Sequence, residues 1–155
     1  MDSDSSALAT GRVPALVIER ATRVDDELIA AFARLIPQLN PHVPVPGPDE
    51  LAVMTSAPGT HLLVVRDPGI VATLTLTVFR IPTGLQGLIN NVIVDEAARG
   101  RGLGEAVTRE AIAVARRLGV VRLQLASRDD RAAANRLYRR LGFQQITTNS
   151  YRMEW

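Results

Sequence analysis

The sequence predicts an α+β fold in three layers, with a mixed, mostly antiparallel central sheet of six to seven strands and about four helices. Along the chain, segments with the alternating apolar pattern of strands are interspersed with segments whose apolar residues recur at helical spacing. With 155 residues, the chain is long enough to bury one hydrophobic core. We expect residues 1–14 to be a disordered tail, because they are rich in Ser, Asp and Ala. Residues 15–155 are expected to form a single domain.

The first elements are two helices and two strands. A helix is predicted where apolar residues recur every three or four positions after Val24, and Asp25 and Asp26 suit its start as a cap and as partners of the helix dipole. The proline-rich segment that follows cannot be regular structure, because proline fixes φ and removes a donor. The expected order is a strand over 16–20, a helix over 24–39, a loop over 40–48, a helix over 49–57 and a strand over 61–65.

The residue pattern in the middle of the chain predicts an antiparallel pair of long strands. Residues 70–80 alternate, with Thr73, Thr75 and Thr77 on one face, so we expect a strand whose threonine face is exposed or, alternatively, lines the acceptor pocket. A turn at 82–84 leads to the next strand over 85–95.

The last part predicts a parallel pair and a closing hairpin. An amphipathic helix over 102–118 connects the strand over 85–95 to a strand over 121–127, and a right-handed crossover makes these strands parallel neighbours. A short helix capped by Asp129 or Asp130 then extends to Leu141. Residues 143–155 are interpreted as a final hairpin.

Composition excludes several classes of function. The chain has no cysteine and two histidines, so we expect no disulfide, no thiol nucleophile and no metal centre. Its net charge is only +2 and aromatic residues make up 4%, which argues against a nucleic-acid partner. No apolar run is long enough for a membrane span and the first residues do not resemble a secretory signal, so we expect no membrane association and a cytoplasmic location. All 18 basic residues are arginine, and without lysine a P-loop cannot form.

The most informative stretch is the loop of alternating arginine and glycine between the strand over 85–95 and the helix over 102–118. A helix N-terminus offers unpaired N–H groups and a partial positive charge, which attract phosphate. Glycine lets the backbone approach a ligand, and arginine adds planar donors. The loop is therefore a candidate anion cradle, and its plain alternative is a glycine-rich turn with solvated arginines. Its residues are Arg99, Gly100, Arg101, Gly102, Leu103 and Gly104.

This loop resembles the (Gln/Arg)-x-x-Gly-x-(Gly/Ala) signature of the GNAT N-acetyltransferase superfamily, and the block Asn135–Phe143 is a second family-like segment. The resemblance implies a GNAT fold and acetyl-CoA as co-substrate, without a metal. It also implies that Arg99–Gly104 hold the pyrophosphate. Val92, Ile93 and Val94 would offer main-chain contacts to the pantetheine arm, where two strands separate. The amide of Ile93 would polarise the thioester carbonyl.

The resemblance also assigns side-chain roles. It places Asn135 against the coenzyme and Tyr138 near its sulfur, where the phenol donates a proton to the departing thiolate. Alternatively, Tyr138 only packs its helix against the core. Asn90 stands where many relatives have a glutamate. Because asparagine cannot act as a base, we expect Asn90 to orient the amine or a water. The loop over 40–48, including His42, is either a plain connector or a wall of the acceptor pocket.

The function expected on this basis is the transfer of acetyl from acetyl-CoA directly to a primary amine of a small molecule, peptide or protein. Transfer is direct because no cysteine is present to carry the acyl group. The alternatives are a non-catalytic CoA-binding sensor or interaction module of the same fold and, from the near-match of the loop to a dinucleotide fingerprint, an oxidoreductase. The acceptor is left open, and so is the oligomeric state, although a homodimer is common among relatives.

Overall fold

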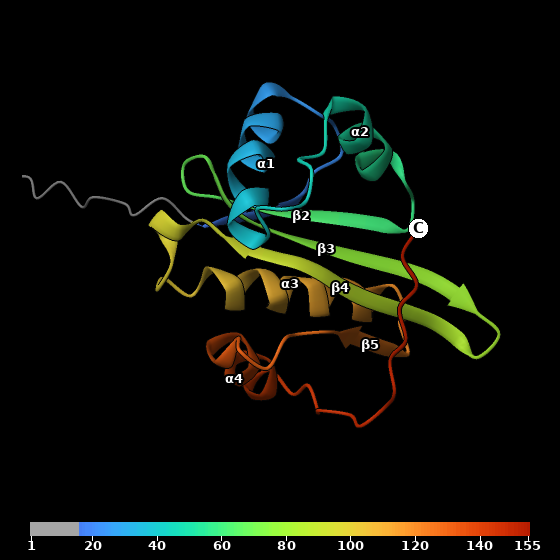
Figure 1. The fold of residues 1–155 in the computed structure, drawn as a ribbon. Coiled ribbons are helices and arrows are strands. Elements are labelled where there is room, and N and C mark those ends of the chain that lie inside the picture. The colour runs from blue at the N-terminus through green and yellow to red at the C-terminus, as the bar shows by residue number, and fades with distance from the viewer. Residues whose placement is uncertain (1–15) are drawn as a thin grey trace, which may run out of the picture.

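The computed structural model describes residues 16–155, and the tail predicted over 1–14 lies outside them. A central sheet separates two helical layers (Figure 1): α1 (Asp26–Leu39) and α2 (Pro48–Ser56) lie on one side, and α3 (Leu103–Arg117) and α4 (Ala132–Arg140) on the other. The three-layer α+β prediction with four helices is therefore confirmed. The strands, in spatial order, are β1 (Val17–Arg20), β2 (Thr60–Arg66), β3 (Ile70–Ile81), β4 (Gly84–Val94) and β5 (Arg122–Leu125).

Within residues 16–155 the sheet has five strands, so the prediction of six to seven is wrong. The predicted hairpin over 143–155 contains no strand. Ile146, Tyr151, Met153 and Trp155 in this segment are exposed. An alternating sequence forms a strand only when a neighbouring strand or a buried face receives it, and beyond Phe143, which packs against the core, this segment has neither.

The pairing of the strands is mixed, as expected. The pairs β1–β2, β2–β3 and β3–β4 are antiparallel, and β4–β5 is parallel. The parallel pairing runs only from Gln86 opposite Arg122 to Ile89 opposite Leu125, whereas β4 continues to Val94. The two strands therefore separate beyond Ile89, and the edge of β4 over 90–94 has no strand partner on that side in the part of the chain described.

Each face of the sheet has its own apolar core. Leu74, Leu76 and Val107 are fully buried between the sheet and α3, and Phe32 and Leu35 of α1 are buried on the opposite face. Because α1 covers that second face, the expectation that the threonine face of β3 is exposed is wrong. Thr73 is 1% exposed, and its hydroxyl donates to the Leu63 carbonyl at 3.0 Å.

The helix caps were predicted with mixed success. Asp25 caps α1 as expected, since its carboxylate accepts from the Leu28 amide at 2.9 Å. The predicted carboxylate cap of α4 is wrong: Arg131 is the N-cap residue and makes no side-chain cap bond. A 3₁₀ turn over Glu96–Ala98, which the sequence analysis did not anticipate, connects β4 to the glycine loop.

Among the described helices, none combines the length and apolar character that a membrane crossing needs.

Candidate functional site

A narrow cavity of about 180 Å³ opens where β4 and β5 separate. Its β4 wall includes Asn90 and Val92, two of the residues predicted for the site. Its opposite wall comes from the segment that follows β5 and from Tyr138 on α4. Three sequence-predicted residues, distant along the chain, therefore surround one cavity. The complete lining is Leu39, Ile89, Asn90, Asn91, Val92, Leu125, Ala126, Ser127, Arg128, Arg131 and Tyr138.

Tyr138 both packs and faces the cavity, so the two interpretations of this residue are compatible. Its ring meets Phe143 edge-on, with centroids 6.0 Å apart. Burial raises the pKa of the Tyr138 phenol above its usual value, and the positive charge of Arg131 opposes that rise only in part. The phenol is therefore protonated at neutral pH and is available as a hydrogen-bond donor.

A bulge in β4 shapes the cavity wall. Thr73 lies opposite Ile93 and Thr75 lies opposite Asn90, so β4 has one residue more than β3 over this stretch. Within this stretch, Asn91 adopts a left-handed φ of 50°. Asparagine tolerates this conformation better than most residues. The sequence analysis missed Asn91, although two consecutive asparagines inside an otherwise apolar strand are a usable signal for a bulge.

Ser127 is a second residue of the site that the sequence analysis missed. Its hydroxyl oxygen is buried and has no hydrogen-bond partner among the described residues, and the side chain lines the narrow cavity. Leaving such a group unpaired costs about 1–3 kcal/mol, so a partner is expected when the cavity is filled. Nothing in the sequence around Ser127 signalled this role beyond its place at the end of a strand.

A wider cavity of about 790 Å³ adjoins the narrow one. It lies against α1, β3 and the proline-rich loop, so that loop is a cavity wall rather than a plain connector. His42 is among the lining residues. The two cavities share Leu39, Asn91, Arg128 and Arg131. They therefore meet at the mouth formed by the bulge of β4 and the segment between β5 and α4.

The arginine–glycine loop has a left-handed backbone at two of its glycines. Gly100 and Gly102 have φ values of 77° and 74°, and a Cβ atom at either would meet nothing within 4 Å. Glycine is thus required by the left-handed backbone, and the space in front of it is open. Gly102 is also the N-cap of α3, so the first amides of this helix lack an intrahelical acceptor. Leu103, by contrast, is 4% exposed and belongs to the core.

Both arginines of the loop have partners within the chain. The Nε of Arg99 donates to the Val94 carbonyl at 3.3 Å, and Arg101 forms an ion pair with Asp67 in the turn between β2 and β3. Both contacts are exposed, and exposed ion pairs contribute little stability. None of the residues Arg99–Gly104 lines either cavity.

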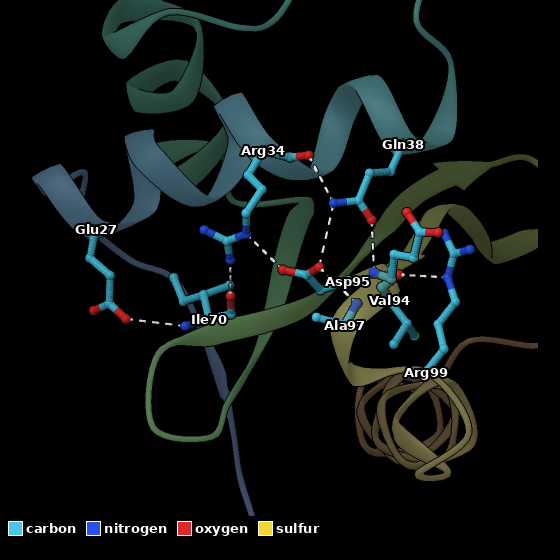
Figure 2. Close-up of polar contacts among 9 residues, drawn as sticks. Glu27, Arg34, Gln38, Ile70, Val94, Asp95, Ala97 and Arg99 are labelled. Atoms are coloured by element: carbon cyan, nitrogen blue, oxygen red, sulfur yellow. Dashed lines mark hydrogen bonds and ion pairs between the residues drawn. The ribbon is translucent and has the colours of Figure 1, made fainter.

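A polar network fixes the start of this loop to α1. Figure 2 shows Arg34 and Gln38 reaching from α1 toward Asp95 at the end of β4. The Nε of Arg34 donates to Asp95 at 2.6 Å, and the Gln38 side-chain oxygen accepts from the Glu96 amide at 2.8 Å. Mainly because Arg34 hydrogen-bonds to it, the pKa of Asp95 lies below its ordinary value. The sequence analysis missed this network, because its partners are far apart along the chain.

Besides the residues of the arginine–glycine loop, three more predicted residues do not line the cavities. Asn135 lines neither cavity, and its amide donates to the Arg128 carbonyl at 2.9 Å. Asn135 therefore holds the turn before α4 in this structure. Ile93 is 3% exposed and packs in the core beneath α1, and Val94 packs against the core beneath α3. Both remain candidates for main-chain contacts only. Within residues 16–155, no group of three or more His, Cys, Asp or Glu side chains forms a metal-binding arrangement.

Comparison with known proteins agrees with this architecture. A model of the acetyltransferase (GNAT) family matches residues 22–143. A mycothiol acetyltransferase from Beutenbergia cavernae is 36% identical over 89 residues, which are 57% of this chain and 30% of that protein, so the match spans less than a third of that relative's length.

Two solved structures are similar over most of the chain. One, from Agrobacterium tumefaciens str. C58 and provisionally named an acetyltransferase, has a TM-score of 0.78 at 26% identity and covers 89% of this chain and 99% of its own. An acetyltransferase from Trypanosoma brucei has a TM-score of 0.71 at 25% identity and covers 90% of this chain and 99% of its own. The chain belongs to the acetyltransferase (GNAT) family.

Proposed function

We propose that this protein transfers acetyl from acetyl-CoA directly to a primary amine while both substrates are bound. The observation that carries the proposal is the junction of the two cavities: a narrow one between separating strands and a wide one beside it share four lining residues. A thioester in the first and an amine in the second would meet at that junction. Such proximity converts a bimolecular reaction into an effectively unimolecular one.

The residues present fit the coenzyme. The unpaired edge of β4 over 90–94 offers backbone groups to an extended chain, and the unpaired Ser127 hydroxyl provides a further polar contact. The open glycines and the free amides at the start of α3 suit a diphosphate, with Arg99 and Arg101 adding charge. When bound, the coenzyme supplies an activated acetyl group as a thioester.

Tyr138 is the proposed proton donor. Its phenol is protonated at neutral pH and lies in the narrow cavity, so it can hydrogen-bond the departing thiolate or give it a proton. Asn90, in the same cavity, is proposed to orient the amine or a water. Neither cavity is lined by Asp or Glu among the described residues. Water then takes the proton that the amine loses on attack, and an acceptor amine of low basicity is already neutral and needs no base before attack.

Calorimetric titration and a thiol-release assay test the proposal. We expect acetyl-CoA and CoA to bind the protein, and thiol release to depend on an added amine. Tyr138→Phe keeps the ring contact with Phe143, so we expect turnover to fall by about 10²-fold or more with nearly unchanged coenzyme affinity. An equal loss of turnover and affinity would assign Tyr138 a structural role. No binding of either coenzyme form at high micromolar concentration would refute the proposal.

A second candidate is a coenzyme-A-binding sensor or interaction module without catalysis. It is favoured by the absence of a carboxylate from both cavity walls in the described part of the chain and by Asn90 in the position where many relatives have an acid. The same two measurements separate the candidates. A sensor would bind the coenzyme and release no thiol with any amine of a broad panel.

A further inference from the structure

The charged side chains that line the wide cavity are all positive among the residues described. Its lining includes two arginines, Arg128 and Arg131, and contains no Asp or Glu among the residues described. The Arg128 Nε lies 3.7 Å from the Asp130 Oδ1, and both side chains are more than 70% exposed, so this ion pair is weak. Arg131 forms no ion pair with any residue of 16–155. A polycationic amine would find no counter-charge in such a cavity. An anionic group would find two planar guanidiniums that suit a carboxylate.

The arginines and the apolar wall occupy different parts of the cavity. Arg128 and Arg131 line the junction with the narrow cavity, where the reacting amine must lie. Phe32, Ile36 and Met54 line only the wide cavity. An acceptor that satisfies both regions has its amine and its anionic group close together, and an apolar body that extends away from both. That arrangement is the chemistry of an α-amino acid with an apolar side chain.

The turn that carries the arginines is held in place. The Arg128 carbonyl accepts two hydrogen bonds, from the Arg131 amide at 3.1 Å and from the Asn135 side chain at 2.9 Å. Arg131 lines the narrow cavity together with Tyr138, the proposed proton donor. A preorganised arginine loses less entropy on binding a ligand than one on a mobile segment.

We propose that the acceptor is an α-amino acid with an apolar side chain, whose carboxylate is bound by Arg128 and Arg131 at the junction of the two cavities. The inference rests on the proposed function, because it names the acceptor of that reaction. It assigns Arg128 and Arg131 the role of specificity-determining residues.

The test compares matched ligands that differ in the carboxylate alone. Leucine is paired with isoamylamine and leucinamide, phenylalanine is paired with phenethylamine, and spermidine represents polycations. Each is titrated into the full-length protein with and without saturating CoA, so the readout is binding rather than turnover. We expect each amino acid to bind at least about tenfold more tightly than its partners without the carboxylate. Equal or tighter binding of the amines, or no binding of any ligand, would overturn the proposal.

Two variants and one control locate the effect. Arg131 and Arg128 line both cavities, so Arg131→Gln and Arg128→Gln should each reduce the ratio of amino-acid to amine affinity by a larger factor than it reduces the affinity for CoA. Arg116→Gln is the control, because Arg116 is exposed on α3 and lines neither cavity. If the variants weaken CoA binding and leave the amino-acid preference intact, the arginines serve the coenzyme and the proposal is wrong.

The failure of the proposed function has a different signature. If the protein prefers amino acids but releases no thiol from acetyl-CoA in their presence, the cavity assignment stands and the transferase assignment fails. If thiol release is fastest with isoamylamine or spermidine, the transferase assignment stands and the amino-acid proposal fails.

Discussion

Removal of the Asp95 carboxylate should destabilise the protein measurably, because this group joins α1 to the segment that leads into the glycine loop. Its side chain is 13% exposed and accepts from the Arg34 Nε at 2.6 Å and from the Ala97 amide at 3.3 Å. Asp95→Ala removes both bonds and leaves Arg34 with the Ile70 carbonyl as its remaining partner in the described chain. Asp95→Asn retains one oxygen as an acceptor but loses the charge.

The expected magnitude follows from these contacts. A hydrogen bond to a charged group contributes about 1.5–3 kcal/mol, and loss of a helix cap costs about 1 kcal/mol. Arg34 is 48% exposed, so water compensates part of the loss and the lower values apply. The Gln38 Nε2 lies 3.5 Å from the Asp95 Oδ1, which is too long for this contact to contribute much stability. We expect Asp95→Ala to lower the free energy of unfolding by about 2 kcal/mol and Asp95→Asn by about half of that.

The effect should depend on pH in a defined direction. The Arg34 hydrogen bond lowers the pKa of Asp95 in the folded state, whereas the unfolded chain keeps an ordinary value of about 3.9. The folded state therefore binds this proton less readily than the unfolded state. The stabilisation is fully present above the unfolded pKa and is lost as the pH falls through the folded pKa. The difference in the free energy of unfolding between wild type and Asp95→Ala should therefore become smaller as the pH falls.

Urea unfolding followed by far-ultraviolet circular dichroism is the suitable assay, because the single tryptophan, Trp155, is exposed and reports poorly on the core. Glu96→Ala is the matched control: Glu96 is an exposed neighbour that contributes its backbone amide, not its carboxylate, to the network. A loss below about 0.5 kcal/mol for Asp95→Ala, the range of ordinary surface changes, would refute this reasoning. A loss that is independent of pH would refute the ionic part.

Three further predictions concern the backbone, the core and the cavity wall. Gly102→Ala should cost about 1 kcal/mol by denaturant unfolding, because its φ of 74° strains an L-residue while the Cβ meets no neighbour; unchanged stability would contradict this. Leu74→Ala should cost about 2–5 kcal/mol in the same assay, since Leu74 is fully buried, and a smaller loss would mean that the core collapses around the deletion. His42→Ala should leave turnover nearly unchanged, because His42 lines the wide cavity but not the narrow one that holds Tyr138; a large loss of turnover with unchanged coenzyme affinity would contradict this.

Part of the candidate site follows from short-range rules. Glycines beside arginines at the start of a helix indicated the loop whose left-handed backbone the structure contains. Asn90 and Tyr138, singled out by family resemblance, do lie around one cavity. Asn135 does not, although it is one helical turn from Tyr138. Helical spacing places two residues on a similar face but does not decide which neighbour each side chain meets, and Asn135 meets the Arg128 carbonyl.

The sequence by itself determined the order of the α-helices and strands as far as α4, the cap of α1 and the parallel pairing of β4 with β5, because periodicity, capping and crossover handedness act locally. Only the tertiary structure decided that the sheet of residues 16–155 has five strands, that α1 buries the Thr73 side chain and that two cavities meet at Arg128 and Arg131. A strand needs an edge to pair with, a face is buried only when another element covers it, and a cavity exists only between segments brought together from different parts of the chain. These are relations between distant residues, and no local pattern encodes them.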